Sequence, residues 1–203
     1  ESRRFTFWHG MKVKKMNYWI SYDHQERSGW LMSRDYEPRS TRVNYRNPAS
    51  NPSYVLEGGG KRNNSYTTMD GIWAKFGIEP TTGSEYFINF HYIEKTRGGP
   101  ASIMDDQNRI NLRRPAFSQF WQFPKFDNWG IDLSGQQQFG SRVTVKGKLF
   151  YHNHVDELES YRDPGYSVYL STSRYKDDMF GGSLSSDIKL AEIDTLKLAL
   201  HYR

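Results

Sequence analysis

The chain has 203 residues, of which 36% are hydrophobic and 16% aromatic, and its formal net charge is +5. So many aromatic residues exclude a disordered chain, and the lack of cysteine excludes a disulfide scaffold and thiolate metal sites. The positive residues are dispersed, apart from a concentration between Arg27 and Arg46, which argues against a nucleic-acid partner.

Side chains alternate between apolar and polar along most of the sequence. Near the C-terminus, Leu196, Leu198 and Leu200 are separated by polar or small residues. This period of two predicts half-buried β-strands, whereas a helix would splay the three leucines around its axis. In chain order, the alternating segments are 3–9, 16–22, 72–79, 86–92, 127–137, 143–154, 184–190 and 195–203.

The connections between these segments alternate in length. Short turns are expected near 10–14, 79–84, 138–142 and 191–194, and long polar connections at 23–66, 96–118 and 155–176. Short turns on one rim and long loops on the other are typical of outer-membrane barrels, where the long loops face the outside of the cell. The predicted fold is therefore all-β, an antiparallel transmembrane β-barrel segment of about eight strands, with long extracellular loops and short periplasmic turns.

The same order predicts that both chain ends lie on the extracellular rim. Residues 1–203 are then expected to be an interior part of one larger barrel domain, with its two open edges paired to further strands. The polar positions are expected to face a water-filled lumen: Lys75, Asn89, His91, Asp132, Gln136, Lys146, Lys148 and Lys197. The aromatic residues expected at the membrane interfaces are Tyr18, Tyr86, Tyr92, Trp129, Tyr151 and Tyr202.

Several motifs resemble those of one known family. They are Gly130–Gly135 running into Leu149–Leu158, Tyr161-Arg-Asp-Pro-Gly-Tyr, Phe180-Gly-Gly-Ser-Leu and the final segment 195–203. Together they resemble the barrel of TonB-dependent outer-membrane receptors, closely over 120–203 and only in style over 14–95. The plug domain and the TonB-engaging segment of that family are absent from these residues.

The resemblance implies a place in the cell outer membrane, among its lipid and lipopolysaccharide. It implies active uptake of a scarce nutrient such as an iron–siderophore chelate or cobalamin, with the TonB complex as a partner through the missing plug region. Two other hypotheses remain open. One is a self-standing eight-stranded barrel that acts as an adhesin or a lipid-modifying enzyme, and the other is a soluble secreted β-sandwich.

Arginine and aromatic side chains in the long connections are the ligand-binding candidates. Guanidinium groups and rings suit an anionic, aromatic chelate through paired hydrogen bonds and stacking. They equally suit lipopolysaccharide phosphates or an ordinary exposed loop. The candidates are Arg27, Trp30, Arg34, Tyr36, Arg39, Arg42 and Tyr45 in the first connection, and Arg113, Arg114 and Trp121 in the aromatic segment 109–126. That segment either lines a ligand vestibule or anchors the strand that follows.

His152 and His154 are the best metal-ligand candidates. Their spacing places both imidazoles on one face of a strand, with Asp156 and Glu157 just beyond. The alternative, a solvated loop edge, is favoured, so no metal or cofactor is expected. No Gly-x-Ser-x-Gly nucleophile motif and no His-Glu-x-x-His motif is present, and enzyme activity is not expected.

Overall fold

The computed structural model describes residues 1–42, 53–101, 120–163 and 165–203. Eight strands form one antiparallel sheet, in which the strands are paired in the order in which they follow one another along the chain. A separate two-stranded sheet is formed by the part of the chain that connects the second of these strands to the third. The large sheet contains β1 (Ser2–Val13), β2 (Met16–Arg27), β5 (Thr67–Ile78), β6 (Ser84–Gly99), β7 (Phe120–Phe139), β8 (Val143–Tyr161), β9 (Tyr169–Lys189) and β10 (Thr195–Tyr202). The small sheet contains β3 (Arg39–Arg42) and β4 (Ser53–Glu57).

The predicted class, all-β with eight antiparallel strands, is therefore confirmed. Each predicted alternating segment coincides with one of the eight strands, and only residues 79, 190 and 203 lie just past a strand end. The part of the chain that the structure describes contains no helix, and so none that could cross a membrane.

Strand register brings the apolar residues of neighbouring strands onto one face. Ile88 of β6 pairs with Leu133 of β7, which pairs in turn with Leu149 of β8. One position along, Asn89 pairs with Asp132 on the opposite face. Because successive side chains point to opposite sides of a sheet, this register gives one continuous apolar face and one mixed, mainly polar face.

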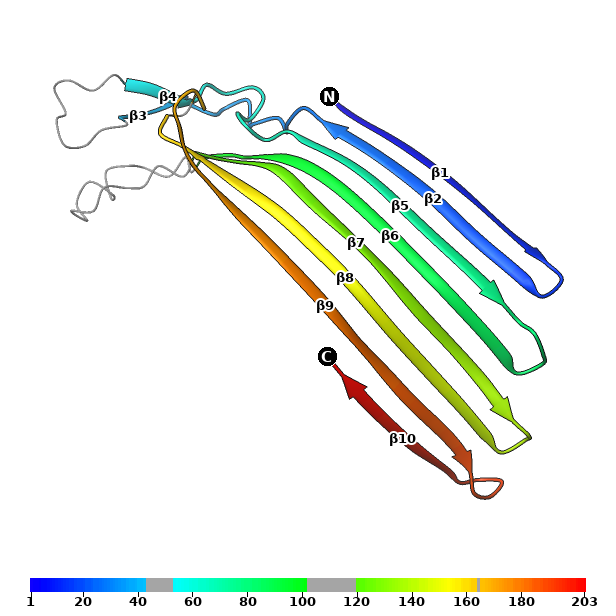
Figure 1. Ribbon diagram of the computed structural model, residues 1–203. Coiled ribbons are helices and arrows are strands. Elements are labelled where there is room, and N and C mark those ends of the chain that lie inside the picture. Colours follow the sequence, from blue (N-terminus) through cyan, green and yellow to red (C-terminus); the bar gives the residue numbers. More distant parts are fainter. Residues whose placement is uncertain (43–52, 102–119, 164) are drawn as a thin grey trace.

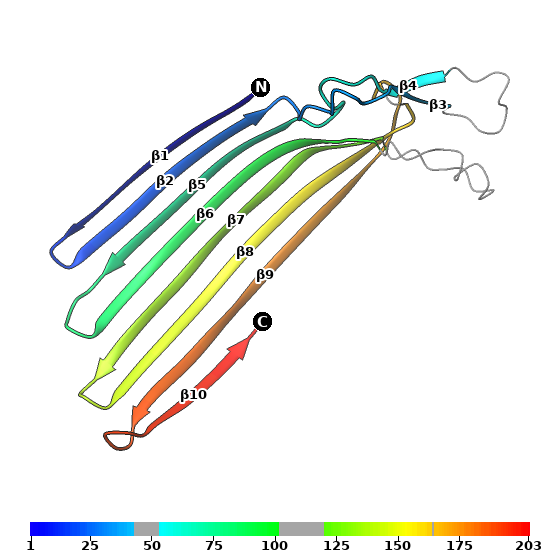
Figure 2. The same cartoon turned by 180° about the vertical axis from the view of Figure 1, so that it is seen from behind.

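The large sheet is a single layer without a core of its own. Phe120 is the one buried hydrophobic residue among those described, whereas Leu149 is 63% exposed and Leu200 is 70% exposed. Figures 1 and 2 show the sheet from its two sides, and no other described element packs on its central part. Soluble monomeric proteins rarely expose a contiguous apolar face of this extent, and such a face marks a surface that a protein partner or a membrane covers.

The two rims of the sheet differ, as the sequence predicts. One rim, which we call the turn rim, carries the connections 14–15, 79–83, 140–142 and 190–194; the other, the loop rim, carries 28–66, 100–119 and 162–168. Gly83 and Gly140 have φ values of 80° and 61°, a left-handed backbone that glycine adopts without strain and that tight turns need.

The N-terminus lies at the loop rim, as expected, but the C-terminus does not reach it. Tyr202, the last residue of β10, pairs with Gly182 in the middle of β9, so the chain ends part-way along the sheet (Figure 1).

The prediction of a long loop over 155–176 is wrong. β8 continues to Tyr161 and β9 begins at Tyr169, with Val155 paired to Lys176 and Ser160 paired to Ser171. Beyond Tyr151 both faces of this hairpin are largely polar, so the apolar alternation ends while the hydrogen-bonded ladder continues. Trp121, placed on a loop from the sequence, likewise lies in β7.

Candidate functional site

A buried ion pair organises the long connection between β2 and β5. Arg62 donates from Nη1 to Oε2 of Glu57 at 2.8 Å, and the exposed fractions of the two side chains are 8% and 0%. The backbone N–H of Asn63 donates to the same carboxylate oxygen at 2.8 Å. Arg62 also donates from Nη2 to the carbonyl of Ala101, which lies beyond β6. The pair therefore joins two connections of the loop rim.

Asn64 extends this link to the ends of two strands. Its amide nitrogen donates to the carbonyl of Gly99 at 3.0 Å and to that of Trp121 at 2.7 Å. The hydroxyl of Tyr166, from the connection between β8 and β9, donates to the carbonyl of Gly99 at 3.3 Å. We call Glu57, Arg62, Asn64 and Tyr166 the rim cluster. It links described residues of all three connections of the loop rim.

Asp163 closes the connection between β8 and β9. Its carboxylate accepts the backbone N–H groups of Gly165, Ser167 and Val168 at 2.7–3.3 Å, and the hydroxyl of Ser167 at 3.0 Å. Burial alone would raise the pKa of Asp163, but these hydrogen bonds outweigh it and hold the pKa below its ordinary value. The carboxylate is therefore the ionised centre of this turn.

We expect the turn to loosen when Asp163 is protonated or removed. Because the folded-state pKa is lowered, its contribution is complete above the unfolded pKa and is lost as the pH falls through the folded value. Backbone amide signals of Gly165 and Val168, followed by NMR, should titrate with a midpoint below that of an ordinary aspartate. Asp163→Asn should abolish this titration; an unchanged titration in that variant would contradict the assignment.

Five of the ten predicted ligand residues have side chains that the structure describes. Trp30 lies beside the rim cluster: its backbone N–H donates to Oγ of Ser65 at 3.2 Å, and its carbonyl accepts the backbone N–H of Arg62 at 2.8 Å. The ring of Tyr36 lies near Gly59, and its hydroxyl is buried without a hydrogen-bond partner among the described residues. Arg27, at the end of β2, and Arg34 are exposed. Trp121 contributes its carbonyl to Asn64 and lies half-buried in β7.

The other predicted ligand residues are Arg39, Arg42, Tyr45, Arg113 and Arg114. Arg39 and Arg42 lie on β3. Tyr45, Arg113 and Arg114 lie outside the described residues.

Sequence reasoning missed the rim cluster. Glu57 and Arg62 flank the Gly58–Gly60 run, which by itself indicates only a flexible loop tip. Asp163 had a usable signal, because Asp-Pro-Gly is a turn motif in which aspartate accepts hydrogen bonds from backbone groups that follow it.

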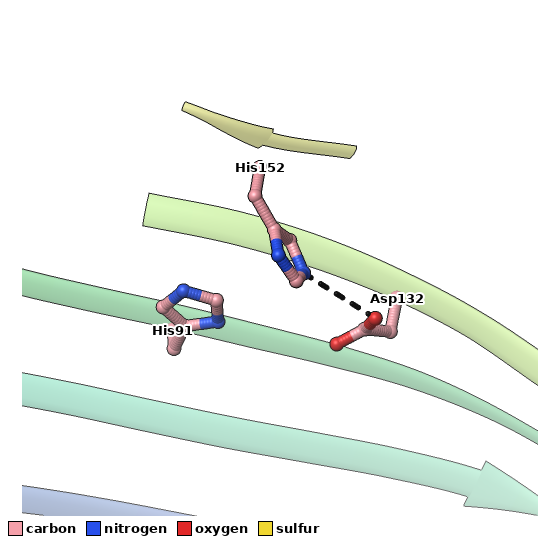
Figure 3. A group of neighbouring side chains, drawn as sticks. All are labelled: His91, Asp132 and His152. Atoms are coloured by element: carbon pink, nitrogen blue, oxygen red, sulfur yellow. Dashed lines mark ion pairs between the residues drawn. The ribbon is translucent and has the colours of Figure 1, made fainter. Parts of the chain in front are cut away.

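The structure separates the two predicted metal-ligand histidines by their partners. His154 lies with Nε2 3.3 Å from Oδ1 of Asp156, and its ring packs against Phe126. His152 instead lies with Nε2 3.4 Å from Oδ1 of Asp132 on β7, and its ring contacts that of His91 on β6 with centroids 5.1 Å apart (Figure 3). The group that forms is His91, Asp132 and His152.

No protein-family model matches this chain, and no curated protein matches it.

Proposed function

We propose that this chain forms part of the wall and mouth of a TonB-dependent outer-membrane receptor, which takes up a scarce nutrient such as an iron–siderophore chelate or cobalamin. The observation that carries the proposal is a single-layer antiparallel sheet with one exposed apolar face and one mainly polar face. Lipid on the apolar side and water on the other is the environment that this pattern fits.

The lengths of the strands support the same proposal. A transmembrane strand needs about 9–11 residues, whereas β7, β8 and β9 have 20, 19 and 21. The surplus lies on the loop-rim side, where the alternation ends. These three strands would therefore rise beyond the bilayer and carry the rim cluster into the outside water.

The edges of the sheet favour a larger barrel over a self-standing one. An eight-stranded barrel would close by pairing β1 with β10, and these two fully described strands do not pair. Unpaired strand edges are not tolerated in hydrocarbon. The proposal therefore requires further strands beside both edges, which an adhesin or a lipid-modifying enzyme of eight strands would not have.

The loop rim supplies the proposed ligand contacts. The rim cluster holds the connection between β2 and β5 against the ends of β6 and β7. This leaves Arg27, Trp30 and Arg34 exposed at the mouth, where a guanidinium group can bind an anionic chelate and an indole ring can stack on it.

Removing this connection tests the proposed function. Arg27 pairs with Thr67, so residues 29–65 can be replaced by a short Asn-Gly turn without disturbing β2 or β5. We expect outer membranes that contain the shortened receptor to lose binding of ferric siderophores or cobalamins, while the barrel still migrates as a compact, heat-modifiable species in electrophoresis.

Shortening the connection 190–194 on the turn rim is the matched control, and it should leave binding unchanged. Full ligand binding by the receptor without residues 29–65 would refute the proposed role of the loop rim.

A further inference from the structure

We propose that His91, Asp132 and His152 form a binding site for a divalent transition-metal ion on the polar face of the sheet. They come from β6, β7 and β8, and one ligand atom of each lies within 4.8 Å of the others (Figure 3). The proposed metal site is inferred from side-chain geometry alone. It therefore goes beyond the proposed function and does not depend on it.

A glycine makes room for the two imidazoles. His91 pairs with Gly130 across β6 and β7, and Gly130 pairs with His152 across β7 and β8. A Cβ atom on Gly130 would lie 2.3 Å from Cδ2 of His152 and 2.5 Å from Cε1 of His91. The two rings therefore meet across the middle strand only because residue 130 has no side chain.

Two of the ligand atoms are buried without a hydrogen-bond partner among the described residues. They are Oδ1 of Asp132 and Nε2 of His152, and they lie 3.4 Å apart. Nζ of Lys148 is 3.2 Å from the same Asp132 oxygen, but not in hydrogen-bond geometry. Buried polar atoms without partners are costly, and an ion bound between them would satisfy both.

The third ligand is oriented by a neighbouring amide. Nε2 of His91 lies 2.8 Å from Oδ1 of Asn128. An amide oxygen can only accept, so Nε2 carries the proton and donates, and Nδ1 keeps its lone pair for a metal. A second hydrogen bond that fixes the ring and its tautomer is the usual arrangement of a metal-bound histidine.

The donor set selects the class of ion. Two imidazoles and one carboxylate suit Zn²⁺ and similar transition-metal ions, whereas Ca²⁺ and Mg²⁺ prefer oxygen ligands alone. Ligand atoms bound to one tetrahedral Zn²⁺ lie about 3.3 Å apart, given bonds of about 2.0 Å. The observed separation of at most 4.8 Å closes to that value by small side-chain rotations. Three protein ligands leave a coordination position for water or a further ligand.

The test is a titration of the untagged, full-length protein in detergent with Zn²⁺, followed by calorimetry, and with Co²⁺, followed by its visible absorption. We expect one saturable site. Asp132→Asn replaces a charged ligand by a neutral amide, and His152→Ala removes a ligand. Each should weaken binding by more than about tenfold, since even the loss of a supporting hydrogen bond costs roughly 10–100-fold. Asn128→Ala removes only the hydrogen bond to His91, so it should weaken binding by roughly 10–100-fold.

Three further variants separate this site from nonspecific binding. Gly130→Ala removes no ligand but should weaken binding as much as His152→Ala, because its Cβ pushes the imidazoles apart. Lys148→Met should tighten binding, because it removes the cation that competes for Asp132. His154→Ala is the matched control and should bind as the wild type does.

The wild-type titration decides first: no saturable binding would overturn the proposal. Equal loss of affinity in His154→Ala and His152→Ala would also overturn it, as would wild-type affinity in Gly130→Ala. A single Zn²⁺ site that is lost in Asp132→Asn and kept in His154→Ala would support it.

Discussion

Replacing Leu133 with arginine should destabilise the sheet in a lipid bilayer by about 2–4 kcal/mol, the cost of a cation on the lipid face near the bilayer midplane. Leu133 lies on the apolar face and is 48% exposed. It lies six residues before the end of β7 at Phe139, which is about 14 Å along the membrane normal for a strand tilted by about 45°. Unfolding of the reconstituted protein in urea, followed by tryptophan fluorescence, measures the effect.

The next residue gives the control. Ser134 lies on the polar face, where it pairs with Lys148 and Phe87. If that face lines a water-filled lumen, Ser134→Arg should change the free energy of unfolding far less than Leu133→Arg. Equal losses in the two variants would mean that both faces have the same surroundings, and the proposed membrane orientation would be wrong.

Glu57→Ala should destabilise the rim cluster by about 3–5 kcal/mol, because it leaves the buried guanidinium of Arg62 without its countercharge. The N–H of Asn63 would lose its acceptor at the same time. We expect the backbone amides of residues 57–66 to exchange hydrogen faster, because the lost stability makes local opening more frequent. The central parts of β6 and β7 should keep their protection. Hydrogen exchange followed by mass spectrometry measures both regions.

An exposed ion pair on the opposite rim provides the comparison. Glu79 accepts from Nζ of Lys12 at 2.7–2.8 Å, and the exposed fractions of these side chains are 36% and 56%. Solvent screens such a pair, so Glu79→Ala should cost less than about 1 kcal/mol. If Glu57→Ala left exchange at 57–66 unchanged, the ion pair would not be what holds the loop rim together.

The eight strands of the large sheet could be found from the sequence because only one face of the sheet is apolar. In such a strand every second residue must be apolar, and residues such as Ile131 and Leu133 in β7 or Leu198 and Leu200 in β10 display this period directly. The short turns were equally visible, since Gly83 and Gly140 provide the backbone that they need.

The ends of the longest strands could not be found in this way. Beyond Tyr151, β8 continues through residues such as Asp156, Glu157 and Glu159, and polar side chains on both faces leave no period. What extends this hairpin is the backbone ladder, which is independent of side-chain type. The short strands β3 and β4 were missed for a related reason, because four or five residues are too few to establish alternation.

The two side-chain clusters depend on contacts between distant segments. The sequence shows that His152 and His154 share a face of β8. Only the register of β7 and β6 against β8 brings Asp132 and His91 close to His152. A shift of one residue in either pairing would move its partner to the other face. The rim cluster likewise joins Arg62 to Ala101 and Asn64 to Trp121, and no local pattern specifies either contact.

The measurement that tests the central claim most directly is a scan of single cysteines along residues 128–136 of β7, each carrying a nitroxide spin label. The chain contains no cysteine, so every label has a unique position. With the protein in lipid, the ratio of collisions with oxygen to collisions with a water-soluble nickel chelate should be high at 129, 131, 133 and 135. The same ratio should be low at 128, 132, 134 and 136. Uniform accessibility along the strand, or the opposite phase, would contradict a sheet whose apolar face meets lipid.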